Sequence, residues 1–235
     1  MNLFFQSLGI EPGWGYALLK GLLVTMQISA GAFLLGIIIG LFIAALRIGK
    51  GPLLSGFARG YCTTFRAVPE LLLILILFYL GSAALNGLST TLGVAMPQLN
   101  GPLVAVMVLG IVQSSYAAEI FRSAIEAIPK GQLEAARAFG MGGLTLYRRV
   151  TIPAMAPNAL AGMANLWINV IKDSALISVV GTNELLYTAR QAAGSTRRYL
   201  TFYLLAAALY YVVTLLSNFV VRKLERRIRR GLTGG

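Results

Sequence analysis

The chain has 235 residues, of which 57% are hydrophobic and only 12% are charged. Water-soluble domains average about a quarter charged residues, so this composition is typical of a protein that lies mostly in a lipid bilayer. The net charge of +12 would suit a nucleic-acid-binding protein, but most basic residues lie between or after long apolar runs, which favours membrane flanks instead. One cysteine and no histidine exclude an intrachain disulfide, a thiolate metal cluster and a histidine-based catalytic dyad.

The apolar residues form runs that are long enough to cross a bilayer. An isolated span must satisfy its own backbone hydrogen bonds, so each run is expected to be an α-helix. The first run contains Gly36 and Gly40, a GxxxG pair that suits a close helix contact but is also common in membrane helices generally. We therefore expect an all-α membrane protein, with 1–235 as a single transmembrane domain of about five helices near 18–46, 67–85, 101–121, 156–180 and 200–221.

The distribution of basic residues predicts the orientation of the chain. Lys and Arg near membrane helices are retained preferentially on the cytoplasmic side. They are concentrated in the connections after the first and third runs and in the tail after the fifth run, whereas residues 81–100 carry no charge. The sequence thus predicts a periplasmic N-terminus and a cytoplasmic C-terminus, with the basic tail beside anionic lipid.

The connection at 127–153 is the only sizeable soluble element expected on the inner face. Strong helix formers in EAARAF, followed by Gly140, predict a short helix. Leu133, Ala136 and Phe139 fall on one face of it, and this periodicity alone favours an amphipathic helix at the membrane surface.

The spacing of this segment indicates a more specific role. Three residues separate the EAA triplet from Gly140, and nine residues separate Gly140 from Val150. Val150, Ile152 and Pro153 then form an aliphatic–any–aliphatic–proline pattern. The pattern resembles the EAA loop of permease subunits in bacterial ATP-binding-cassette importers, although Val150 and Ile152 replace the usual Ile and Leu. In that family the loop forms a coupling helix seated on the ATPase subunit. The resemblance assigns this role to Glu134, Ala135, Ala136, Gly140 and Pro153.

The resemblance extends over most of the chain. FRAVPELLLILILFYLG at 65–81 and INVIKDSALISVVGTNELLYTARQA at 168–192 are similar to permeases of polar amino acid importers. FRAVPE, in place of a more usual RGTP-like sequence, looks closest to importers of histidine, arginine, lysine or opines. The resemblance implies a type I importer permease in the bacterial inner membrane that moves its substrate inward by alternating access.

The same resemblance implies the partners of the chain. These are an ABC ATPase dimer, a second permease that is identical or homologous, and a periplasmic solute-binding protein. No GxxxxGK[ST] loop is present, so ATP and Mg²⁺ are expected on the ATPase, with no cofactor and no catalysis on this chain. The connection at 181–199 is a candidate dock for the binding protein or, alternatively, a solvated re-entrant cap.

Ionisable side chains inside the runs are candidates for the substrate pathway, because they are costly in lipid. Arg66 and Glu70 are four residues apart, so they fit a structural ion pair or interfacial snorkelling as well as a pathway role. Glu119 and Arg122, three residues apart, favour a structural pair. Asn165, Asn169 and either Lys172 or Asp173 share a face of the fourth run, which suits the seam between two permeases.

Our hypothesis for substrate recognition is that Asp173 and Glu70 present negative charge to a cationic group, while Ser114, Ser115 and Asn169 supply neutral hydrogen bonds. The alternative is that the Lys172–Ser174 stretch only ties helices together. A different function, an autonomous channel or a secondary transporter with proton coupling through these charges, remains open on the sequence. A membrane enzyme is disfavoured because no nucleophile and base constellation is present.

Overall fold

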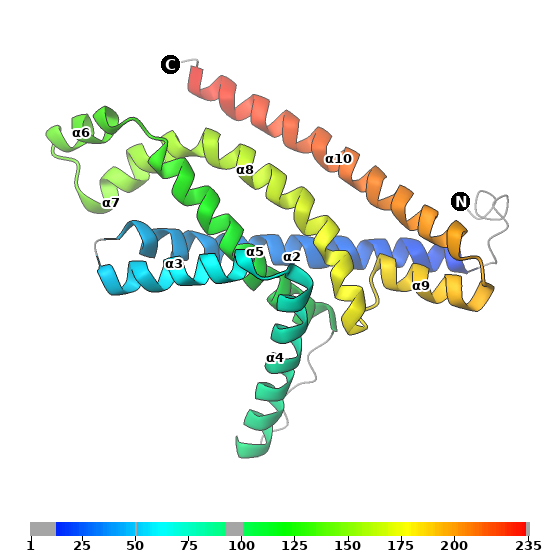
Figure 1. Cartoon of the computed structure of the whole chain (residues 1–235). Helices are drawn as coiled ribbons and strands as arrows, with labels where there is room; N and C mark the ends of the chain where they lie inside the picture. The colour runs from blue at the N-terminus through cyan, green and yellow to red at the C-terminus, as the bar shows by residue number, and fades with distance from the viewer. Residues whose placement is uncertain (1–12, 50, 93–100, 234–235) are drawn as a thin grey trace.

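The computed structural model describes residues 13–49, 51–92 and 101–233, and all regular secondary structure in these ranges is helical (Figure 1). Within these ranges, four stretches are long and apolar enough to cross a membrane, and a bent pair of helices gives a fifth when it is counted as one span. This confirms the expected all-α architecture with about five spans. Part of the uncharged connection used to predict the orientation, residues 93–100, lies outside the described ranges.

The centre of the bundle is formed by α2 (Trp14–Ile48) and α5 (Gly101–Glu126). A Cβ atom on Gly40 would lie 2.6 Å from the Cβ atom of Ala117, and one on Gly36 would lie 3.4 Å from that of Gln113. The first of these distances leaves no room for any side chain other than hydrogen. The GxxxG pair therefore does mark a close helix contact, and buried Ile28 and Leu109 belong to the core around it.

The second span differs from its prediction. The apolar helix α4 begins at Glu70 and ends at Leu92, and a separate helix, α3 (Pro52–Ala67), precedes it where a connection was expected. The two are bent by 113° at Val68 and Pro69. Proline has no amide hydrogen and disfavours the helical conformation of the residue before it, and Val68 is indeed extended. As a result α4 projects from the side of the bundle (Figure 1).

The fourth span is preceded by a short helical excursion. It consists of α6 (Lys130–Ala138), α7 (Gly143–Leu146) and a π-helical turn at Tyr147–Thr151, which continues into α8 (Ile152–Asp173). The span then ends in a 3₁₀ segment, Ser174–Val180.

Helix α9 and the start of α10 lie at the opposite end from α6 (Figure 1). The short helix α9 (Leu185–Thr196) precedes α10 (Tyr199–Thr233), and both pack on the N-terminal part of α2 around buried Leu18 and Phe202. Figure 1 shows α6, α7, the end of α2 and the start of α3 together at one end of the molecule. The basic residues in the last turn of α2 and in the π-helical turn before α8 therefore lie at the same end of the bundle.

Candidate functional site

The helix expected in the EAA segment is present as α6, and its two faces differ. Glu134 and Ala135 are exposed, whereas Ala136 is only 7% exposed and packs on its own chain. Phe139 was expected on the apolar face with Ala136, but it follows the last helical residue and is 84% exposed. Only Glu134 and Ala135 of the EAA triplet are thus available to another protein.

The turn after α6 depends on Gly140. Its φ of 77° lies in the left-handed region, which is strained for residues with a Cβ atom. The chain then returns to α8, where Pro153 stands in the first turn. Pro153, Pro129 and Gln132 line a cavity of about 410 Å³ under the loop, so the two ends of the EAA segment meet there.

The polar centre of the bundle lies where α8 ends. The amide of Gln113 on α5 donates a hydrogen bond of 2.8 Å to the carboxylate of Asp173. Glu70, the first residue of α4, lies close enough to Asp173 and to Tyr116 to interact electrostatically with both. The structure therefore brings together the two predicted acids, which are far apart in the sequence.

The predicted polar face of α8 is exposed on this chain. Asn165, Asn169 and Lys172 all lie on the surface, while Asp173 is half-buried. A membrane helix does not present such a row to lipid, so this face lies against another protein or against water.

Two predicted pathway residues are not placed to contact a substrate. Ser114 and Ser115 are fully buried. The Ser114 hydroxyl lies 2.7 Å from the Tyr61 hydroxyl and donates to the Ile111 carbonyl, while Ser115 donates to the Val112 carbonyl. Their hydroxyls satisfy local backbone groups, as is common for serine within helices.

Arg66 does not pair with Glu70, in contrast to one of its predicted interpretations. Its guanidinium lies 2.9 Å from the Glu119 carboxylate on α5. The predicted pair of Glu119 and Arg122 is present, and Arg47 of α2 also binds Glu119, at 2.5 Å. Three guanidinium groups thus surround one carboxylate.

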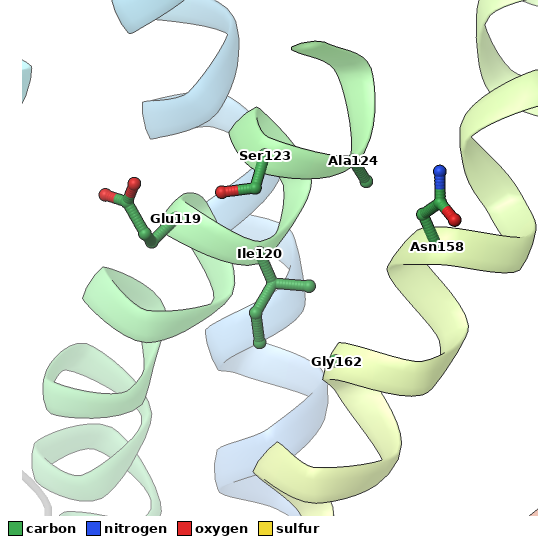
Figure 2. A pocket seen from close by; sticks show the side chains of 6 residues that line it. All are labelled: Glu119, Ile120, Ser123, Ala124, Asn158 and Gly162. Atoms are coloured by element: carbon green, nitrogen blue, oxygen red, sulfur yellow. The ribbon is translucent and has the colours of Figure 1, made fainter. Parts of the chain in front are cut away.

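A second cavity lies next to this cluster. It measures about 280 Å³ between α5 and α8 and is lined by Glu119, Ile120, Ser123, Ala124, Asn158 and Gly162. Figure 2 shows Ile120 and Ala124 on the side of α5 that faces α8, while the Glu119 carboxylate points away from α8.

Sequence reasoning missed a buried acid in the connection after α8. Glu184 is fully buried and caps α9 by accepting hydrogen bonds from the backbone amides of Leu186 and Tyr187. It also accepts hydrogen bonds from the hydroxyls of Thr25 on α2 and Tyr210 on α10. Burial raises the pKa of the Glu184 carboxyl, and the hydrogen bonds oppose this shift.

Signals for some of the missed residues were present in the sequence. Acidic side chains are favourable near helix N-termini, so the acid directly before a run of helix formers was a signal for the role of Glu184 at the start of α9. Gln113 is a lone amide in an apolar run, which is a signal for a buried polar contact. Nothing local distinguishes Arg47 from the other basic residues that follow the first run.

A bundle of long apolar helices with an acidic centre and an exposed helical loop at one end has the architecture of a transporter's membrane subunit. The family described as "Binding-protein-dependent transport system inner membrane component" matches residues 36–230. The chain therefore belongs to this family and is a permease subunit of the ABC importer class, located in the inner membrane.

Relatives match almost the whole chain. The octopine transport system permease protein OccQ of Rhizobium radiobacter is 38% identical, with 99% of each chain covered. The histidine/lysine/arginine/ornithine transport system permease protein HisQ of Escherichia coli is 34% identical over 94% of this chain and 96% of its own. A solved amino acid ABC transporter is 32% identical, with a TM-score of 0.79 and coverage of 95% and 98%.

Proposed function

We propose that this chain takes up amino acids or opines that carry a basic group, and that a separate ATPase drives it through α6. The observation that carries this proposal is the exposure of Glu134 and Ala135 on a helix held between two membrane spans. The small side chain of Ala135 allows close approach of another protein, and Ala136 anchors the opposite face.

The substrate class is supported by the polar centre. Asp173 and Glu70 supply negative charge, and exposed Asn169 and Lys172 stand on the same helix end. The four amino acids in the name of the HisQ relative all carry a basic side chain, and a cation is the group that two adjacent carboxylates attract. In this proposal, exposed Lys172 supplies the positive charge that binds the substrate carboxylate.

The proposal includes a second permease subunit, identical or homologous. Leu71, Leu72, Ile76 and Leu80 are exposed on α4, which projects from the bundle. The polar face of α8 also needs a partner, because asparagine and lysine are not stable against lipid.

The remaining partners follow from the two ends of the bundle. A periplasmic binding protein docks on the outer connection around α9, where Arg190 is exposed. ATP and Mg²⁺ bind the ATPase at the inner end, beyond α6. The N-terminus is then periplasmic and the C-terminus cytoplasmic.

A cysteine crosslink tests the proposed coupling. Ala135→Cys is expected to form a crosslink to the ATPase in intact membranes, whereas Ala136→Cys, which points into its own chain, is expected to form much less. Equal absence of crosslinks at both positions would contradict the role of α6.

Uptake by vesicles separates the proposal from an autonomous carrier. Vesicles containing the chain, a second permease, the ATPase and the binding protein are expected to accumulate arginine only with ATP inside. Uptake without the ATPase would instead identify a secondary transporter.

A further inference from the structure

One carboxylate joins three helices at the inner half of the bundle. Glu119 of α5 binds Arg47 at the end of α2 at 2.5 Å, Arg66 at the end of α3 at 2.9 Å, and Arg122 one turn along its own helix. Arg122 also binds Glu126, so the cluster continues to the end of α5. We call these four residues, Glu119, Arg47, Arg66 and Arg122, the Glu119 cluster.

The arginines of this cluster are not equivalent. The side chain of Arg47 is 12% exposed, whereas that of Arg66 is 34% exposed. Arg47 and the neighbouring Arg122 hold the carboxylate in place on the tightly packed pair of α2 and α5. Arg66 can exchange its ion pair for water more readily, because more of its side chain is exposed to solvent.

Arg66 stands on one side of the break between α3 and α4, and Glu70 stands on the other. Only Ala67, Val68 and Pro69 separate them, and the two helices meet there at 113°. Glu70 is beside Asp173, in the proposed substrate site. A change in the ion pair of Arg66 can therefore move Glu70 in the proposed substrate site, because only three residues lie between them.

The other partner of the ion pair leads to the coupling loop. After Glu119, α5 runs without interruption to Glu126. Ile128, in the turn that follows, is 5% exposed and packs in the same core as Leu133 of α6 and Met155 of α8. Displacement of α6 is thus transmitted to α5 through packed side chains and a continuous helix.

We infer that Glu119 and Arg66 are positioning residues that couple the ATPase to the substrate site: their ion pair sets the angle of the break between α3 and α4. The inference rests on the proposed function, and it adds a connection between the two sites. When α6 moves, the ion pair loosens or tightens, and Glu70 approaches or leaves Asp173.

The contact between α3 and α5 does not depend on this ion pair alone. Tyr61 lies between the two helices, with its hydroxyl donating to the Ile111 carbonyl at 2.9 Å, and Cys62 packs with Ala118. Removing the ion pair is therefore expected to leave α3 in place and to release mainly its last turn, next to the break.

Glu119→Gln is the test, with Glu126→Gln as the matched control on the same helix. The complex of two permeases and the ATPase is reconstituted in proteoliposomes, and ATPase activity is measured with and without arginine-loaded binding protein. We expect Glu119→Gln to keep normal assembly and basal activity, but to lose at least four-fifths of the stimulation and of arginine uptake. Glu126→Gln is expected to retain both.

A double-mutant cycle distinguishes coupling from a general structural role. If Glu119 and Arg66 act as a pair, Arg66→Gln alone and Arg66→Gln with Glu119→Gln are expected to give the same loss of stimulation, while Arg66→Lys retains most of it. If the two losses multiply, or if assembly falls in proportion to stimulation, the inference is wrong.

If the Glu119→Gln complex does not assemble, Arg66→Gln replaces it as the test variant, because it leaves Glu119 bound to Arg47 and Arg122. The expected result is the same loss of at least four-fifths of the stimulation and of arginine uptake. Normal stimulation in that variant overturns the inference. Absence of ATP-dependent uptake by the wild-type complex overturns the proposed function instead.

Discussion

Tyr210 donates a hydrogen bond of 2.8 Å to Glu184, which joins the last membrane span to the connection before α9. The same carboxylate accepts a hydrogen bond from Thr25 on α2. One buried acid therefore links α2, from the start of the chain, to α9 and α10 near its end, at the end of the bundle opposite α6.

Glu184→Ala is expected to destabilise the protein by about 2–4 kcal/mol. The change removes the cap of α9 and leaves the hydroxyls of buried Thr25 and half-buried Tyr210 without their acceptor. Thermal unfolding in detergent measures the effect. Tyr210→Phe removes one hydrogen bond and should cost only about 1 kcal/mol. Equal losses in the two variants would show that the carboxylate is not the central group.

Glu184 also predicts a dependence of stability on pH. Burial raises its pKa above the ordinary value of 4.5, so the folded protein holds this proton more tightly than the unfolded chain does. The contribution of this group is then fully present below pH 4.5 and is lost as the pH rises toward the raised pKa. The advantage of the wild type over Glu184→Ala should therefore narrow with rising pH. A gap that widens would contradict the direction of the shift.

Gly40→Ala is expected to destabilise the contact between α2 and α5. The added methyl would lie 2.6 Å from the Cβ atom of Ala117, and overpacking of this kind costs about 1–3 kcal/mol. Gly60→Ala on α3 is the control, because nothing lies within 4 Å of its added methyl, and it should be neutral or stabilising. The difference in stability is tested by comparing the unfolding midpoints of the two variants in the same detergent.

Cys62 reports on the position of α3. It is fully buried beside Ile43 and Ala118, so maleimide should label it slowly in the wild type. Glu119→Gln is expected to leave this labelling rate nearly unchanged, because Tyr61 and Cys62 hold this part of α3 on α5 without the ion pair. A rate that rises about tenfold, measured by mass spectrometry of the Cys62 peptide, would mean that the ion pair holds more of α3 than its last turn.

Asp173→Asn is expected to weaken transport of basic substrates. Loss of one carboxylate from the polar centre should raise the half-saturating arginine concentration about tenfold, since charged hydrogen bonds contribute about 1.5–3 kcal/mol. Asp173→Glu keeps the charge and should retain most of the uptake. An unchanged concentration dependence in Asp173→Asn would exclude Asp173 from the substrate site.

Features that depend on local order could be predicted from the sequence. The apolar runs define the spans, because helix length is set by bilayer thickness, and EAARAF with Gly140 predicts α6 and its end. The pair of Glu119 and Arg122 follows from helical spacing alone.

Features that depend on packing could not be predicted in the same way. Arg47 and Glu119 are 72 residues apart, and only the close contact of α2 and α5 brings them together. Helix α3 was missed because it is too polar overall to be recognised as a span, although its buried residues Ser55, Ala58 and Cys62 recur at helical spacing. Ser114 is polar, as expected of a residue in a substrate pathway, but the orientation of α5 points its side chain into the packed interior of the chain.

The close contact at Gly40 determines where the molecule is able to change shape. Two helices that touch backbone to side chain without a gap cannot slide, since any shift would create either a clash or a void. They form a rigid frame that moves as one body. Rearrangement is left to the segments hinged at Pro69 and at the π-helical turn before α8, on either side of that frame.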